Sequence, residues 1–174
     1  MSFAKRRLVI VGESPSPRGR SDLSLFPHPK NSAGYRLSEI TGLGHAGYTQ
    51  RTQRINLHPE HVPDHRWSTP SARAAAENLV ASDFLTGREV ILLGSRVLEA
   101  FIPDVKVNRI RPCQWYEHVG RGGEHKFKWA LIPHPSGRNR WYNDVQNKRA
   151  VYHFLREDTA LHASLWGQAE DAEI

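Results

Sequence analysis

The sequence passes from a short apolar strand into a proline-stiffened loop at Trp129-Ala-Leu-Ile-Pro-His-Pro-Ser-Gly-Arg-Asn-Arg-Trp-Tyr-Asn143. Each of the two prolines fixes φ and donates no N–H, which predicts a rigid loop that holds His134 and Ser136. Guanidinium, amide and aromatic groups follow in Arg138, Asn139, Arg140, Trp141 and Tyr142. Such groups on a pre-shaped loop suit a nucleic acid whose bases are unstacked or pushed aside. A plain strand-to-helix connection with an exposed aromatic has the same pattern.

The length and composition indicate one globular domain. The 174 residues can bury a sizeable core, and we expect a single domain over residues 1–166 and a frayed acidic tail at 167–174. Hydrophobic residues make up 39% and charged residues 24%, which is ordinary for a soluble protein. The sequence shows neither an apolar run near the ~18 residues of a membrane span nor a signal-peptide core. We therefore expect a cytoplasmic protein that acts as a monomer.

Cysteine content and net charge narrow the classes of partner. The single cysteine, Cys113, excludes an internal disulfide and any site built on several cysteine ligands. The formal net charge is +6, and arginine outnumbers lysine. Positive charge favours a polyanionic partner, because neutralised phosphates supply much of the affinity of proteins for nucleic acids. Many basic proteins bind no nucleic acid, so the charge supports a site and does not define one.

Apolar segments alternate with helical patterns along the chain. The expected strands are residues 7–11, 50–56, 89–93 and 126–132. Three helices are expected at residues 34–43, with Gly42 or Gly44 as the C-cap, at residues 72–84, with Ser71 as the N-cap, and at residues 95–101, with Ser95 as the N-cap. A last helix is expected to begin after Asn143 or Asp144 and to end at Glu157, with Val145, Val151, Tyr152 and Leu155 on its apolar face. Residues 18–34 and 57–70 are expected loops, and residues 103–126 an irregular hairpin that turns at Gly120 to Gly123.

This alternation predicts an α/β fold, in which helices cover both faces of a mainly parallel sheet. In such sheets, ligands bind beyond the carboxyl ends of the strands. Glu13, Asn56, Gly94 and His134 each follow the last residues of an expected strand. The topology therefore predicts that these four residues meet at one edge of the sheet and form a site.

Several common catalytic patterns do not fit. Ser14 and Ser16 lie in a Gly-Glu-Ser-Pro-Ser segment that departs from the Gly-x-Ser-x-Gly nucleophile turn at its last position. Prolines separate His58, His61 and His65, which share no helical face, and this disfavours zinc. The first loop also lacks the Gly-x-x-x-x-Gly-Lys phosphate cradle. We expect neither a metal nor an organic cofactor.

Three side chains at the predicted edge have suitable chemistry. Glu13 can orient water or stabilise positive charge in a transition state, although a solvated loop carboxylate fits the pattern too. His134, held between two prolines, can donate a hydrogen bond to an oxygen that becomes negative during a reaction. Asn56 offers both a donor and an acceptor, which suits reading the edge of a base, but it also suits a turn at a strand end.

Taken together, these motifs resemble the uracil-DNA glycosylase superfamily. Val9-Ile-Val-Gly-Glu-Ser-Pro-Ser-Pro17 resembles its water-activating loop, in the form with Glu after Gly that the iron–sulfur branch has. His134-Pro-Ser-Gly-Arg-Asn139 is similar to its His-Pro-Ser intercalation motif, and its continuation is closest to the single-strand-selective monofunctional branch. The segments that fit between them in order are Ala33-Gly34-x-x-Leu37, Arg54-Ile-Asn56 and Val90-Ile-Leu-Leu-Gly94. The resemblance spans about residues 7–150.

The resemblance implies a single, uracil-DNA glycosylase-like α/β/α domain that binds DNA, flips a nucleotide out of the stack and hydrolyses its N-glycosidic bond without a cofactor. Glu13 would stabilise the cationic sugar and position water, and His134 would hydrogen-bond the base oxygen. The implied base-recognition residues are Asn56, Ser14 and Phe26, which would stack on the base. The implied DNA-binding residues are Ser136, Arg138, Asn139, Arg140 and Trp141.

The chain also departs from the family. The cluster cysteines are missing, so no iron–sulfur cluster is expected. Ser14 stands where other branches have the Asp or Asn that handles the attacking water, and Arg140 or Trp141 replaces the wedge leucine. The substrate thus stays open between uracil and a 5-substituted pyrimidine, such as hydroxymethyluracil or a phage-modified base. Strand preference, a role in repair or in defence against foreign DNA, and an inactive DNA-binding module as the alternative also stay open.

Overall fold

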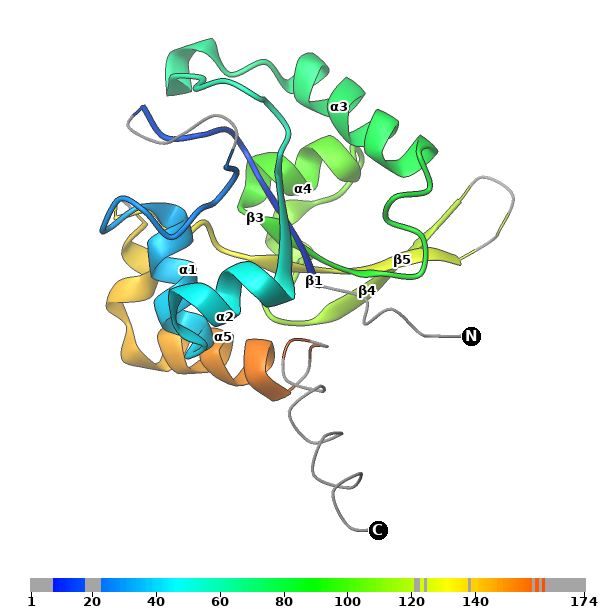
Figure 1. The fold of residues 1–174 in the computed structure, drawn as a ribbon. Coiled ribbons are helices and arrows are strands. Elements are labelled where there is room, and N and C mark those ends of the chain that lie inside the picture. Colours follow the sequence, from blue (N-terminus) through cyan, green and yellow to red (C-terminus); the bar gives the residue numbers. More distant parts are fainter. Residues whose placement is uncertain are drawn as a thin grey trace, which may run out of the picture.

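The computed structural model describes residues 8–17, 23–120, 123, 125–137, 139–157, 159 and 161. These residues form one five-stranded sheet with helices on both faces, so the expected α/β/α architecture is confirmed (Figure 1). Several expectations lie outside the described residues: the strand start at Arg7, residues 18–22 of the first loop, most of the turn after Gly120, Arg138, and the acidic tail at 167–174.

The sheet is parallel except at one edge. Its strands are β1 (Leu8–Gly12), β2 (Thr52–Asn56), β3 (Glu89–Leu93), β4 (Trp115–Val119) and β5 (His125–Ile132). They lie in the order β2-β1-β3-β5-β4, and only β4, which forms a hairpin with β5, runs antiparallel. The mainly parallel sheet is therefore confirmed. A hairpin is also present, but its strands are Trp115–Val119 and His125–Ile132, and residues 103–114 of the expected hairpin lie outside it.

The helices divide between the two faces of the sheet. They are α1 (Ala33–Thr41), α2 (Gly44–Arg51), α3 (Thr69–Ala81), α4 (Ser95–Phe101) and α5 (Val145–Glu157), with short 3-10 turns at Asp64–Arg66, Val107–Arg109 and Arg140–Asn143. α3 and α4 cover one face, and α1, α2 and α5 cover the other (Figure 1). None of the helices in the described part of the chain is both long and apolar enough to cross a lipid bilayer.

Strand β1 contributes to both cores because successive side chains of a strand point to opposite faces. Val9 and Val11 pack in the core beneath α3 and α4. Leu8 and Ile10 pack in the core beneath α1, α2 and α5. All four side chains are buried, which is why the segment reads as a continuous apolar run and not as an alternating one.

The strand prediction for Gln50 and Arg51 was wrong, and helix α2 was not predicted. We expected Gln50 and Arg51 to begin a strand, whereas helix α2 runs from Gly44 to Arg51 and β2 begins only at Thr52. Glycine at positions 44 and 47 lowers helix propensity, and only Tyr48 of this helix is buried. A helix with a single core contact has no apolar periodicity by which it could be found.

The caps of three helices refine the predicted boundaries. Helix α1 ends at Gly42, one of the two expected caps, whose φ of 67° suits glycine. Helix α3 begins at Thr69 and is capped by Ser68, not Ser71, because Pro70 fits the first turn of a helix and does not delay it. Helix α4 follows Gly94, and Ser95 is already inside it.

The apolar face of α5 also differs from the prediction. Val151 and Leu155 are buried as expected, and Phe154 is buried between them. Val145 is 57% exposed, and Tyr152 is only half-buried. The buried stripe therefore covers the second half of the helix and leaves an apolar residue at its start uncovered.

Candidate active site

The ends of three parallel strands bring Glu13, Gly94 and His134 together. A Cβ atom built on Gly94 would lie 3.2 Å from Cβ of His134 and 3.6 Å from Oε1 of Glu13. Gly94 has a φ of 88°, which L side chains rarely adopt, and its N–H donates to the carbonyl of Ile132 at 2.9 Å. Glycine therefore allows the loops after β1 and β5 to approach each other across the end of β3.

Glu13 and His134 line the same cleft, whose volume is about 290 Å³. Its walls come from the loop after β1, the segment before α1, the loop after β2 and the loop after β5. Of the expected site residues, the cleft is also lined by Ser14, Phe26 and Ser136. This volume is at the small end of the range for ligand sites, which suits a compact ligand or part of a larger one.

An arginine on α4 holds the carboxylate of Glu13. Nη1 of Arg96 lies 3.3 Å from Oε2 of Glu13 and 2.9 Å from Oδ1 of Asp64. The hydrogen bond to Asp64, followed by the negative charge of Glu13, raises the pKa of Arg96. Two carboxylates therefore lie against one guanidinium beside the cleft, and the carboxylate of Glu13 suits a ligand that develops positive charge.

The loop that carries His134 is fixed by three hydrogen bonds as well as by its prolines. The Tyr142 hydroxyl donates to the carbonyl of Pro133 at 2.7 Å. Nδ2 of Asn139 donates to the carbonyl of His134 at 3.0 Å, and the Asn139 N–H donates to the carbonyl of Ser136 at 3.1 Å. The expected rigidity of this loop therefore has a second source, which is anchoring by residues that follow it.

The imidazole of His134 is biased toward its neutral form. Burial lowers its pKa, and the nearby charge of Arg96 lowers it further, whereas the carboxylates of Glu13 and Asp64 oppose this in part. A neutral imidazole carries one N–H and can donate one hydrogen bond to an oxygen in the cleft.

We expect His134 to make folding less favourable in acid. The unfolded histidine titrates near pH 6.5 and the folded one at a lower pH, so the unfolded state binds more protons between these values. The free energy of unfolding therefore falls as the pH falls below about 6.5. Urea unfolding at several pH values between 7.5 and 5 should show a shallower loss for His134→Asn than for wild type. Burial and the nearby Lys126 also lower the pKa of His118, so a His118 variant provides the comparison. An unchanged dependence of the free energy of unfolding on pH in His134→Asn would contradict the assignment.

Asn56 does not line the cleft. Both polar atoms of its carboxamide are buried without a hydrogen-bond partner in the described structure. A Cβ atom on Gly12 would lie 2.6 Å from Oδ1 of Asn56 and 3.2 Å from both methyl groups of Leu25. Leu25, which lines the cleft in a left-handed conformation with a φ of 49°, thus lies close to the unpaired amide. Three of the four strand-end residues, Glu13, Gly94 and His134, therefore meet as expected, whereas Asn56 lies outside the cleft lining.

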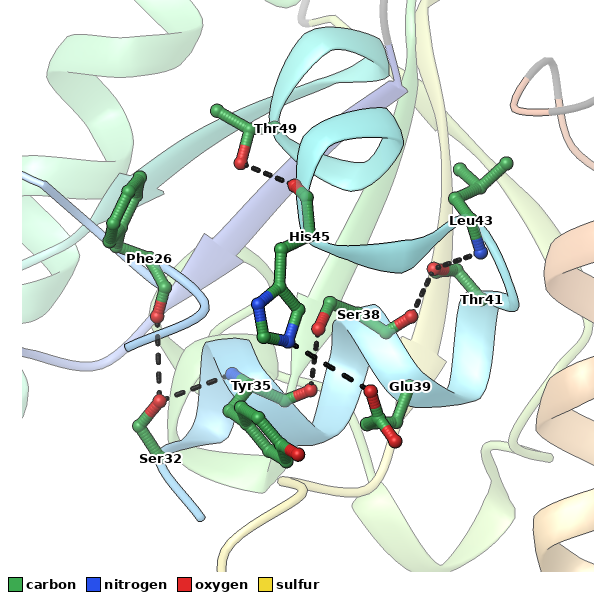
Figure 2. Close-up of polar contacts among 9 residues, drawn as sticks. All are labelled: Phe26, Ser32, Tyr35, Ser38, Glu39, Thr41, Leu43, His45 and Thr49. Atoms are coloured by element: carbon green, nitrogen blue, oxygen red, sulfur yellow. Dashed lines mark hydrogen bonds and ion pairs between the residues drawn. The ribbon is translucent and has the colours of Figure 1, made fainter. Parts of the chain in front are cut away.

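The segment before α1 carries Leu25 and Phe26 and is anchored from three sides. Nε of Arg54 donates to the carbonyl of Ser24, and the Tyr48 hydroxyl donates to the carbonyl of Leu25, both at 3.2 Å. Figure 2 shows the Phe26 carbonyl turned toward the Ser32 hydroxyl, 3.4 Å away, while its ring points away from α1. These anchors hold the Phe26 ring at the cleft, where a planar ligand could stack on it.

Gly34 lets this segment pack against α1, and replacing it is expected to destabilise the protein. A Cβ atom at position 34 would collide with the carbonyl oxygens of Leu25 and Phe26. We expect Gly34→Ala to lower the free energy of unfolding by about 1–3 kcal/mol, the usual effect of overpacking, despite the ~1 kcal/mol helix preference of alanine. Urea denaturation measures the difference. Gly47→Ala in α2 is the matched control, since its nearest neighbours would be side-chain atoms of Leu43, and an equal loss in both variants would contradict the argument.

Ser14 is engaged by the loop after β2. Its hydroxyl oxygen accepts a hydrogen bond from the Val62 N–H at 3.3 Å, and Nδ1 of His61 lies 2.9 Å from the carbonyl of Pro15. His58 packs edge-on against Trp67. Within the described ranges, no group of three or more His, Cys, Asp or Glu side chains is arranged to hold a metal ion.

The residues expected to bind DNA fall into different environments. Arg140 is exposed, and Ser136 lines the cleft. Trp141 is only partly exposed, because it packs against the α1/α5 side of the core and against Tyr142, which is buried. The side chain of Asn139 bonds within its own loop and accepts from the Trp141 N–H at 3.1 Å. Arg138 lies outside the described residues.

Sequence reasoning missed two residues of this site. Arg96 gave only a weak signal: it is a basic residue in the first turn of a helix that follows a glycine at the end of a strand. Leu25 gave no signal, because the segment around it has no periodicity and its position depends on contacts with Arg54 and Tyr48.

Neither a scan against protein-family models nor a search of curated proteins finds a match to this chain.

Proposed function

We propose that this protein is a monofunctional DNA glycosylase, which hydrolyses the N-glycosidic bond of a flipped-out uracil or 5-substituted pyrimidine. The observation that carries the proposal is the meeting of Glu13 and His134 across Gly94 at one small cleft. A carboxylate and a neutral imidazole in the lining of one cleft match the two charges that such a bond produces when it breaks. The motif resemblance gives the same assignment to the same two residues.

The reaction separates charge, and each residue acts on one part of it. As the bond between C1′ and the base nitrogen breaks, its electrons go to the base and leave positive charge on the sugar. Glu13 stabilises the sugar cation and accepts a proton from the water whose oxygen bonds to C1′. Arg96 keeps the carboxylate in place, and Asp64 balances the charge of the arginine.

His134 acts on the leaving base. A neutral imidazole donates its N–H to a base oxygen as negative charge builds there, which stabilises the transition state more than the ground state. Phe26 lines the cleft, and in this proposal its ring stacks on the base. Ser136 lines the same cleft as His134, and in this proposal it contacts the nucleotide backbone.

Asn56 would recognise the base only after Leu25 moves. Its unpaired buried amide costs free energy that a hydrogen-bonding ligand would recover, which favours a role in recognition over a purely structural one. In this proposal the incoming base displaces the Leu25 side chain and pairs its edge with Asn56.

The direct test is the detection of abasic sites in DNA. Purified protein is incubated with single- and double-stranded oligonucleotides that carry uracil, hydroxymethyluracil or an unmodified pyrimidine, and abasic sites are then cleaved with alkali. The proposal requires cleavage at one of the modified positions and none in unmodified DNA. Absence of cleavage on every substrate would refute it.

One observation favours a DNA-binding module without activity as the second candidate. The hydroxyl of Ser14 is already bonded to the Val62 N–H, and Ser14 stands where the family has a residue that handles water. Binding of the same oligonucleotides without any abasic product would support this second candidate.

A further inference from the structure

A second groove lies beside the cleft, between α1 and α5. Its volume is about 420 Å³, and Pro135 and Tyr142 line it where the loop after β5 passes by. Part of α1 forms one wall, and the first half of α5 forms the other. None of the residues assigned to the proposed reaction lines this groove.

Helical spacing places one face of each helix in the groove. Residues 36, 39 and 40 of α1 and residues 145, 148, 149 and 152 of α5 recur at intervals of three or four. The apolar part of the surface comes from Ile40, Val145 and Tyr152. Val145 is 57% exposed and is one of only two large, exposed hydrophobic side chains in the described part of the chain.

The groove is rimmed by positive charge. Arg36, Lys148 and Arg149 line it, and no ion pair engages any of the three within the described residues. Arg156 extends the basic surface, since its guanidinium stacks 4.8 Å from the ring centre of Tyr152. The one acidic side chain of the lining, Glu39, lies 3.9 Å from Nε2 of His45 (Figure 2).

The groove and the cleft share a wall. Pro135 faces the groove, whereas Ser136 and Gly137 line the cleft. A Cβ atom on Gly137 would lie 3.0 Å from Nη2 of Arg36, so this guanidinium lies at the boundary between the two. A chain molecule with one unit in the cleft can therefore continue into the groove past Arg36.

We propose that this groove binds the nucleic-acid strand next to the nucleotide that enters the cleft. Arg36, Lys148 and Arg149 contact its phosphates, and Val145 and Tyr152 pack against a sugar or an unstacked base. Mixed basic and apolar surface is what single-stranded nucleic acid requires, because phosphates and base faces alternate along it. The identity of the ligand rests on the proposed function, and the groove extends that function to a stretch of several nucleotides.

The test compares two double charge reversals in the full-length protein. Lys148→Glu with Arg149→Glu changes the groove, and Lys106→Glu with Arg109→Glu, exposed on the α3/α4 side of the sheet, gives the same change in net charge. Binding of fluorescein-labelled oligothymidine is followed by anisotropy over a range of salt concentrations. We expect the groove variant to bind at least ~10-fold more weakly and to lose ~1.4 from its logarithmic salt slope, or ~0.7 for each lost phosphate contact. In the control variant, the affinity and the salt slope should change far less.

Two outcomes would overturn the inference: equal losses in both variants, or no loss in the groove variant. A loss seen only for labelled polyglutamate, with oligothymidine binding unchanged, would also overturn it in favour of an acidic peptide. Because anisotropy reports binding and not base excision, the measurement does not depend on catalysis. A protein that binds through the groove and excises nothing would refute the proposed function alone, and one that excises but tolerates the charge reversal would refute the groove alone.

Discussion

Replacing His134 by Ala is expected to lower the rate of base excision at least ~100-fold, in line with the loss of one preorganised hydrogen-bond donor to a developing oxyanion. The effect should appear in the chemical step, because the imidazole meets the full charge only when the glycosidic bond is breaking. Single-turnover excision with enzyme in excess over a uracil- or hydroxymethyluracil-containing oligonucleotide measures that step directly.

The loss should not come from unfolding. The loop is anchored through its backbone, by Asn139 to the carbonyl of His134 and by Tyr142 to that of Pro133, and neither bond needs the imidazole. The melting temperature should therefore change little. His65→Ala, which removes an exposed histidine outside the cleft lining, is the control and should excise at the wild-type rate. Excision by His134→Ala within a few-fold of wild type would remove His134 from the mechanism.

The central strands were predictable because burial on both faces leaves a plain sequence pattern. β3 has the expected bounds, Glu89–Leu93, and its last four residues are fully buried. The parallel topology followed from the alternation of strands with helices, and the meeting of Glu13 with His134 followed from the topology. The linear pattern of apolar residues was sufficient to predict this part of the site, because the carboxyl ends of parallel strands lie at one edge of the sheet.

Positions set by single long-range contacts were not predictable. The segment before α1 is placed by Arg54 and Tyr48, which lie more than twenty residues away in the sequence and gave no sign of this role. Its placement puts Leu25 near the amide of Asn56, which does not line the cleft, and a segment without periodicity gives no sign of this contact. Arg96 was missed for the same reason, since its ion pair with Glu13 joins residues 83 positions apart.

Replacing Glu13 by Gln is expected to lower excision ~100-fold, because the amide keeps the shape of the side chain and loses the charge that stabilises the sugar cation. The contact with Arg96 makes this prediction more specific. Arg96 touches the carboxylate and not the proposed substrate position, so it acts by positioning Glu13. Arg96→Gln alone should therefore lower excision roughly 10-fold, within the usual range for coupled neighbours.

The double variant Glu13→Gln with Arg96→Gln distinguishes a positioning role of Arg96 from a general loss of protein stability. If Arg96 works only through Glu13, Arg96→Gln should have almost no further effect on excision once Glu13 is already Gln, and the two losses should not multiply. Arg88→Gln is the matched control, since Arg88 is another partly buried arginine, bonded to Gln53 at 2.6 Å and stacked on Phe84 before the start of β3. Arg88→Gln should change the rate of excision little, both in the wild-type protein and in the Glu13→Gln variant. Losses that multiply for Arg96 would mean that the guanidinium contacts the substrate itself and does not act only by positioning Glu13.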